Sequence, residues 1–282
     1  MGMDVHMHMV LDGVDWKAAI GRHSRQVDEA YVRNILKIYR AGGYTYLRDG
    51  GDRWGVGLRA RELAGEYGIV YRTPLAPLCQ KDHYGSFIGK TYENMAQFAA
   101  LVREIRACGG DFIKIMISGL MDFDRFGVLS EEGLPPQQIA ELIHIAHEEG
   151  FAVMAHANGA RTVEAAAQAG VDSVEHGAYL DEDALAAMAE MGTVWVPTLS
   201  TVGNLRGKGR FDEMAVAAIF ESTGANIQRF AAMGGLIACG SDAGAWAVPH
   251  GCGTEEKLLQ QLLGERAEEI LQKGNARIVE KF

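Results

Sequence analysis

Six residues with side chains suited to metal chemistry are spread along the chain. They are His6, His8, Lys114, His156, His176 and Asp242. Each falls where an expected strand ends and a loop begins. Imidazoles, a carboxylate and a buried lysine at strand ends are the components of a metal site that activates water. We therefore expect these residues to meet in one site.

His6 and His8 stand two residues apart in an expected strand, so their side chains share one face of it. Two imidazoles at that spacing can bind one ion. Taken alone, the pair is equally compatible with two surface histidines on an edge strand.

Lys114 lies within the apolar run Phe112–Ile117, which is expected to be a buried strand. Burying an unpaired ammonium group is costly. The lysine can extend its ammonium group to solvent, pair with a carboxylate, or carry a carbamate formed with carbon dioxide that bridges two cations.

Taken singly, the other three candidates have ordinary explanations. His156 and His176 each end an apolar run, where a hydrogen-bonded core histidine is common. Asp242 can be a plain turn or N-cap residue. Coincidence at the ends of five separate strands is much less plausible than one shared site.

Apolar runs typical of buried strands alternate with amphipathic helical patterns along the chain. The expected strands are Met3–Met9, Tyr44–Arg48, Val70–Leu78, Phe112–Ile117, Ala152–His156, Ser173–His176, Val194–Thr198 and Leu236–Gly240. The expected helices are Asp28–Arg40, Val56–Tyr67, Tyr92–Ala107, Pro135–Glu149, Arg161–Ala169, Asp183–Met191, Met214–Met233 and Glu255–Leu263.

Eight strands alternating with eight helices predict an α/β fold of the (β/α)8 TIM barrel type, with residues 1–282 forming a single domain. A doubly wound sheet is the alternative. The barrel is favoured because the six candidates come from five strands distributed from the first to the eighth, and only a closed barrel brings the first and eighth strands together at one end. The glycine-containing segment Pro197–Arg210 follows the seventh strand and is expected to be a mobile active-site loop.

The motifs at these strand ends resemble those of the amidohydrolase superfamily, in its binuclear-metal branch. Within it, the chain is similar to imidazolonepropionase-like and Xaa-Pro or Xaa-Arg dipeptidase-type proteins. The motifs that carry the resemblance are Asp4–His8, Leu47–Gly51, Phe112–Met116, Ala155–Gly159, Val174–Gly177, Val196–Leu199 and Gly240–Gly244.

The resemblance implies two divalent ions, with zinc favoured by the imidazole and carboxylate ligands. It implies that His6, His8 and Asp242 hold one ion and that His156 and His176 hold the other. A carboxylated Lys114 and a hydroxide then bridge the two ions. The hydroxide attacks the substrate carbonyl, and Asp242 moves the proton to the leaving group.

The chain departs from such relatives in two respects. They carry a small β-sandwich beside the barrel, whereas here the first strand begins near Met1 and the sequence ends soon after Gly274–Val279. We expect the barrel to lack most or all of this sandwich, and the chain to form a homo-oligomer or to be less stable than a longer chain. Asn158 also stands where many dipeptidase-like relatives have histidine.

The composition of the chain limits which binding partners and which cellular compartment we expect for it. The formal net charge of −10 argues against nucleic acid as a partner. The four cysteines form neither a CxxC motif nor a disulfide framework, which favours a reducing cytoplasm. No apolar run reaches the ~18 residues of a membrane span. A small-molecule substrate is therefore expected.

The expected activity is hydrolysis of an amide bond in a small carboxylate-bearing molecule, such as a dipeptide, an N-acyl amino acid or a cyclic amide. A lactonase or other ester hydrolase on the same metals is one alternative, and a metal-binding barrel without hydrolytic activity is the other. The candidate substrate contacts are Arg48, His83, Tyr84, Asn158 and His250, with Arg48 expected to pair with the carboxylate.

Overall fold

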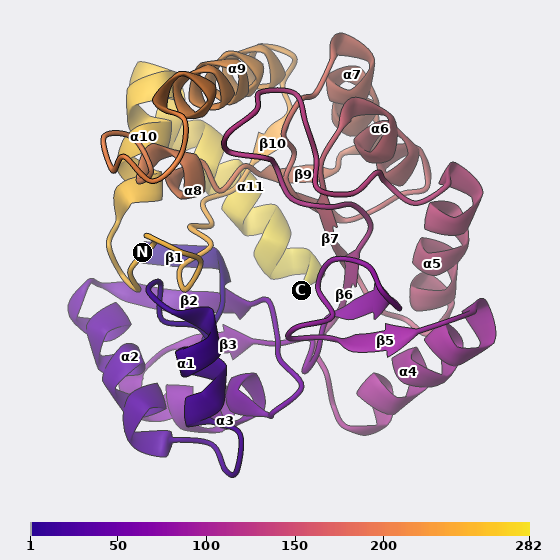
Figure 1. The fold of residues 1–282 in the computed structure, drawn as a ribbon, viewed down its shortest axis with the longest axis vertical. Helices are drawn as coiled ribbons and strands as arrows, with labels where there is room; N and C mark the ends of the chain where they lie inside the picture. Colours follow the sequence, from indigo (N-terminus) through magenta and orange to yellow (C-terminus); the bar gives the residue numbers. More distant parts are fainter. Residues whose placement is uncertain (1) are drawn as a thin grey trace.

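Parallel strands alternate with helices along nearly the whole chain, as the apolar runs predict. The structure is a computed structural model and describes residues 2–282. The strands lie toward the centre of the molecule and most of the helices lie outside them (Figure 1). The α/β class predicted from the sequence is confirmed.

The strands form two parallel sheets. The smaller sheet has the order β1 (Gly2–Met7), β2 (Tyr44–Asp49) and β3 (Val70–Arg72). The larger sheet has the order β10 (Leu236–Ile237), β9 (Val194–Val196), β8 (Ser173–His176), β7 (Val153–Ala157), β6 (Ile113–Met116), β4 (Leu78–Gln80) and β5 (Lys90–Tyr92).

Backbone hydrogen bonds connect the two sheets at both of their junctions. Beside β1, the backbone amide of Val5 donates to the carbonyl of Cys239 at 3.0 Å, and the backbone amide of Asp242 donates to the carbonyl of His6 at 2.6 Å. Beyond β3, the backbone amide of Asp111 donates to the carbonyl of Thr73 at 3.0 Å. The segment after β10 therefore runs alongside the first strand.

Most helices match their predicted ranges closely. They are α2 (Glu29–Ala41), α3 (Val56–Ala64) with the 3-10 turn Gly65–Tyr67, α4 (Met95–Ala107), α5 (Pro136–Glu148), α6 (Ala160–Gln168), α7 (Glu182–Met191), α9 (Glu213–Ala232) and α10 (Thr254–Leu263). Helix α5 buries the predicted face of Ile139, Leu142, Ile143 and Ala146. No helix within residues 2–282 combines the length and apolarity needed to cross a lipid bilayer.

Two boundaries differ from the prediction for local reasons. The expected strand Val70–Leu78 is divided into β3 and β4, because Pro74 and Pro77 cannot donate a hydrogen bond to a neighbouring strand. Helix α4 begins three residues later than expected. Its N-cap is Asn94, whose side chain accepts the amide of Gln97 at 3.0 Å, and Tyr92 belongs to β5.

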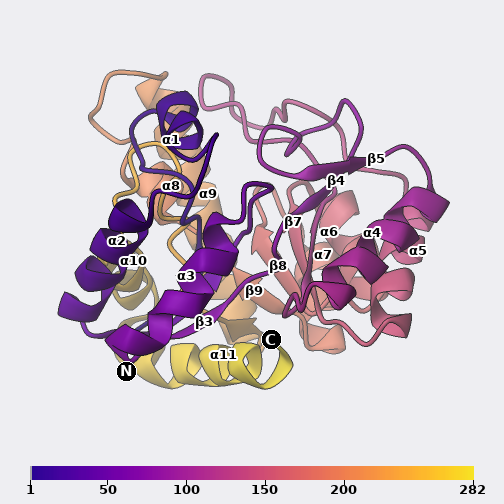
Figure 2. The same cartoon turned by 90° about the horizontal axis from the view of Figure 1, so that it is seen from below.

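Three helices were not predicted. They are α1 (Trp16–Arg22), α8 (Ser200–Gly203) and α11 (Ala267–Lys281). Helix α11 contacts β1, β9 and β10, and lies across the end of the strands opposite the loops around β4 and β5 (Figure 2). It approaches closely at Gly274, where a Cβ would lie 2.0 Å from the carbonyl oxygen of Ile237. The helix therefore connects the two sheets.

The Arg48 side chain crosses the interior from β2 to β8 and is completely buried. Its Nη2 donates to Glu175 Oε1 at 2.8 Å, and its Nε donates to the Val5 carbonyl at 2.6 Å. The guanidinium also stacks on Phe282, 4.4 Å from the ring centroid. This buried ion pair thus links strands of both sheets.

We predict that Arg48→Met lowers the free energy of unfolding by about 3–5 kcal/mol, because Glu175 is left as an uncompensated buried charge. Urea unfolding measures the change. The matched control is Arg106→Met, whose ion pair with Glu149 is at the surface and should contribute less than about 1 kcal/mol. Equal unfolding midpoints for Arg48→Met and the native chain would contradict the prediction.

Candidate metal centre

The side chains of His6 and His8 lie on the same face of the chain at β1, as their spacing predicts. His6 lies within the strand and His8 directly follows it. The ring of His8 occupies the space above Gly50, where a Cβ would lie 2.2 Å from Cε1 of His8. Only glycine at this position leaves room for the imidazole.

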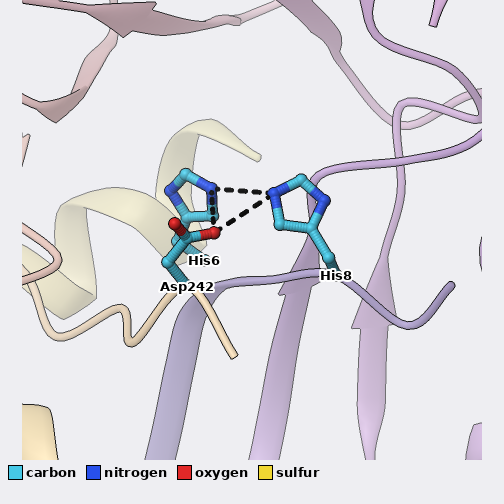
Figure 3. A group of neighbouring side chains, drawn as sticks. All are labelled: His6, His8 and Asp242. Atoms are coloured by element: carbon cyan, nitrogen blue, oxygen red, sulfur yellow. Dashed lines mark hydrogen bonds and ion pairs between the residues drawn. The ribbon is translucent and has the colours of Figure 1, made fainter. Parts of the chain in front are cut away.

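His6, His8 and Asp242 bring three ligand atoms together (Figure 3). The two Nε2 atoms lie 3.4 Å apart, and Asp242 Oδ1 lies 3.5 Å from His6 and 3.3 Å from His8. A tetrahedral zinc ion with bonds of 2.0–2.1 Å separates its ligand atoms by about 3.3 Å. The side chains therefore fit one ion of this size.

Glu175 fixes the orientation of His6. Its Oε2 accepts a hydrogen bond from His6 Nδ1 at 2.7 Å. The proton is thereby held on Nδ1, and the lone pair of Nε2 faces His8 and Asp242. Sequence reasoning assigned no role to Glu175, although a charged residue directly before His176 in a buried strand was the available signal.

Lys114 is buried in β6, with its Nζ 3.2 Å from His6 Nε2. It lies two residues before the end of the strand, not at the end as expected. No carboxylate within residues 2–282 forms an ion pair with it. Burial lowers the pKa of Lys114 to about 8, although Glu175 and Asp242 act in the opposite direction. The amine therefore loses its proton at a much lower pH than an exposed lysine does.

His156 and His176 lie beside the three-residue group. Their ring centroids are 4.5 Å apart, and that of His176 is 5.1 Å from His6. Nε2 of His156 donates to the Gly119 carbonyl at 3.2 Å, and Nδ1 of His176 lies 2.8 Å from the Thr198 hydroxyl. One nitrogen of each ring has a protein partner, which leaves the other nitrogen to bind a ligand.

The imidazoles are held in the neutral form that coordinates metal. Burial lowers the pKa of His156 to about 3 and takes the pKa of His6 and His176 well below the usual value. Burial alone would raise the pKa of Asp242, but a hydrogen bond with His8 and the nearby ammonium group of Lys114 lower it. Asp242 is therefore a carboxylate at neutral pH.

Two of the candidate metal ligands have an uncommon backbone conformation. His176 and Asp242 have φ values of 70° and 59°, and Thr198, the partner of His176, has 48°. Non-glycine residues seldom adopt this left-handed region, and they often do so at functional sites.

Asp4 holds the Asp242 turn against β1. Its carboxylate accepts hydrogen bonds from the amide of Ser241 at 2.9 Å and from the Ser241 hydroxyl at 2.6 Å. Burial raises the pKa of Asp4 to about 6, although these hydrogen bonds lower it. Asp4 belongs to the Asp4–His8 motif that contributes to the family resemblance, but its hydrogen bonds to Ser241 were not predicted.

A cavity of about 420 Å³ opens above these side chains. Five of the six predicted metal ligands line it, and His6 lies buried behind them. Among the predicted substrate contacts, Tyr84 lines the cavity, with its ring 4.7 Å from that of His156. Thr201, Leu205 and Arg210 also line it, so the segment Pro197–Arg210 contributes to the wall as expected.

The other predicted substrate contacts do not line the cavity. Arg48 is committed to Glu175 inside the strands, and His250 donates to the Leu11 carbonyl at 2.9 Å. The side-chain amide of Asn158 donates to the Gly119 carbonyl and accepts from the Ala178 amide, which links the loop after β6 to the loop after β8. His83 faces Glu131 near the surface, 3.3 Å away. Their positions near strand ends did not reveal where these side chains point.

Comparison with curated proteins gives partial matches, and no family model matches the chain. Ochratoxinase from Aspergillus niger is 29% identical over 155 residues, or 51% of this chain and 28% of the relative. An uncharacterized protein from Mycobacterium tuberculosis is 34% identical over 136 residues, or 46% of this chain and 36% of the relative. The matched regions thus span about a third of these relatives.

Solved structures match nearly all of the chain. A Xaa-Pro dipeptidase with bound methionine gives a TM-score of 0.79 at 22% identity, covering 99% of this chain and 74% of that one. Aspergillus niger ochratoxinase gives 0.76 at 20% identity, covering 98% and 70%. A prolidase bound to N-methylphosphonate-L-proline gives 0.77 at 22% identity, covering 99% and 74%. The chain therefore has the fold of the amidohydrolase-type proteins that its motifs resemble.

Proposed function

We propose that this chain is a metal-dependent hydrolase that cleaves an amide bond of a small carboxylate-bearing molecule. The observation that carries the proposal is the convergence of His6, His8 and Asp242 within 3.5 Å of one another, beside a cavity. The substrate classes are dipeptides, N-acyl amino acids and cyclic amides. The names of the structural relatives, which include a Xaa-Pro dipeptidase, a prolidase and an amidohydrolase, support carbon–nitrogen bond hydrolysis.

The proposed scaffold is one closed (β/α)8 barrel forming a single domain. Hydrogen bonds from β1 to residues 239–243, and from Asp111 to Thr73, support closure because they join the sheets at both edges. With β3 and β4 as two parts of one strand, and β5 as an addition, the chain supplies eight barrel strands.

The proposed centre holds two ions. Zinc suits the imidazole and carboxylate donors of His6, His8 and Asp242. His156 and His176 are the proposed protein ligands of the second ion. Carboxylated Lys114 would bridge the two, since an uncharged amine adds to carbon dioxide with loss of a proton. The burial of Lys114 and its lack of an ion pair among the described residues support this modification.

Divalent ions bound by these residues would supply an acidified water molecule and polarise the substrate carbonyl. Asp242 contacts both histidines through Oδ1, so Oδ2 is the atom proposed to receive the proton of the attacking water. The same atom then protonates the leaving nitrogen. Glu175 keeps the proton of His6 on Nδ1 throughout.

We also propose that the protein works in the cytoplasm. The four cysteines, Cys79, Cys108, Cys239 and Cys252, are all free thiols in the described chain. A reducing compartment keeps such thiols unpaired.

The test measures metal content and turnover of a panel of dipeptides, N-acyl amino acids and lactones, with and without a chelator. We expect about two ions per chain and amide turnover that the chelator abolishes. Faster turnover of lactones would indicate an ester hydrolase on the same site. Bound metal without turnover of any panel member would indicate a barrel that binds metal without hydrolytic activity.

We predict that Lys114→Ala loses much of the metal and nearly all turnover, because the bridging ligand is removed. A short carboxylic acid added to the variant should partly restore both. Metal analysis and amide turnover measure the effect. The control is Lys273→Ala, on the exposed surface of α11, which should retain both properties. A metal-replete native protein with one ion or none and an unmodified Lys114 would rule out the two-ion centre.

We predict that Asp242→Asn lowers turnover by about 10²–10⁴-fold, the usual contribution of a general base, while much of the metal stays bound. The amide still coordinates weakly but cannot carry the proton. Steady-state kinetics on metal-analysed protein measure the change. Asp183→Asn, at an exposed site in α7, is the matched control. Near-native turnover in Asp242→Asn would assign proton transfer to another group.

A further inference from the structure

We propose that the cavity selects N-acyl amino acids with a bulky apolar acyl group and that Arg210 binds the substrate carboxylate. The inference rests on the proposed amide hydrolysis and specifies its substrate. It concerns the part of the cavity lining that lies outside the candidate metal ligands.

Two sets of contacting aromatic rings contribute to the cavity wall. In the first, Phe87 lies 5.3 Å from Trp16 and 5.9 Å from Tyr84. In the second, Phe211 lies 5.2 Å from Phe123 and 6.1 Å from Trp246. With a volume of about 420 Å³, the cavity accommodates a ligand with an aromatic or long aliphatic group.

Part of this wall is exposed to water. Val14 is 75% exposed and Trp16 is 48% exposed, and both line the cavity. Covering such side chains with an apolar acyl group removes apolar surface from water and favours binding. A small polar dipeptide would leave them exposed.

Arg210 is the charged side chain that lines the cavity outside the candidate metal centre, within residues 2–282. Its guanidinium carbon lies 4.0 Å from the Trp246 ring and 5.4 Å from the Phe211 ring. Stacking occupies the face of the guanidinium and leaves its N–H edge free for bidentate contact with a carboxylate.

The protein supplies no competing carboxylate for this edge. None of the ion pairs in the described part of the chain includes Arg210. The nearby Glu213 accepts the amides of Gly207 and Gly209, each at 2.9 Å. These bonds occupy one oxygen each and fix the loop that carries Arg210.

The charges of the cavity also disfavour a free amino terminus. A dipeptide carries an ammonium group near the scissile bond. Within the described residues, the acidic side chain lining the cavity is Asp242, which belongs to the candidate metal centre. An ammonium group beside the proposed metal ligands, once these hold their ions, would lack a carboxylate partner of its own and would be repelled. An N-acyl group removes this charge.

The experiment compares kcat/KM for N-benzoylphenylalanine, its C-terminal carboxamide and alanylproline. In the native, metal-loaded protein we expect N-benzoylphenylalanine to be the best of the three. Arg210→Met should lower kcat/KM for the acid by about 10- to 100-fold, the loss of a charge-assisted contact, and leave the carboxamide nearly unchanged. The matched control is Arg206→Met in the same loop, whose guanidinium stacks on Phe220 and does not line the cavity.

A binding measurement separates this inference from the proposed function. Calorimetry with the non-hydrolysable ketomethylene analogue of N-benzoylphenylalanine should show a similar Arg210-dependent loss of affinity. If that loss occurs but no amide is hydrolysed, the proposed hydrolase fails and the ligand assignment stands. If alanylproline is cleaved as well as N-benzoylphenylalanine, and Arg210→Met changes neither turnover nor affinity, the hydrolase stands and the assignment is overturned.

Discussion

The hydrogen bond between Glu175 and Nδ1 of His6, 2.7 Å long, is the interaction on which the candidate centre depends. It directs the lone pair of His6 Nε2 toward His8 and Asp242. A buried carboxylate needs its own counter-charge, and Arg48 supplies it at 2.8 Å. The orientation of His6, a candidate metal ligand on β1, thus depends on Arg48 of β2 and Glu175 of β8. The same buried ion pair stabilises the fold and orients the candidate site.

The position of β1, at the edge of the smaller sheet and beside the segment after β10, imposes a second constraint. The segment that carries Asp242 must run beside β1 and then turn its carboxylate toward His6. The turn places Asp242 at a φ of 59°, and Asp4 stabilises it by accepting two hydrogen bonds from Ser241. An uncommon backbone conformation is therefore maintained by a buried carboxylate on the neighbouring strand.

The sequence was sufficient to predict the α/β class and the order of the elements, because periodicity determines these features locally. It also predicted the gathering of His6, His8 and Asp242, because ligand-type residues stood at the ends of the first and last expected strands. It was not sufficient for Arg48. A residue near a strand end can point into the interior between the strands or into the cavity, and the pairing of Arg48 with the distant Glu175 decides this. Helix α11 was missed although Ile270, Leu271, Gly274 and Ile278 follow a helical period.

The cavity wall was the part least accessible from sequence, because most of its side chains come from loops whose conformation depends on distant contacts. Arg210 follows two glycines in a segment without periodicity, and its position depends on Glu213 and on stacking against Trp246. Five of the six candidate ligands, by contrast, lie on or directly after strands, and Asp242 lies in the turn beside β1. The fold thus separates most of the candidate ligands, on the strands, from the cavity wall, on the loops. The loops can change without moving the ligands, and proteins that share the centre need not share a substrate.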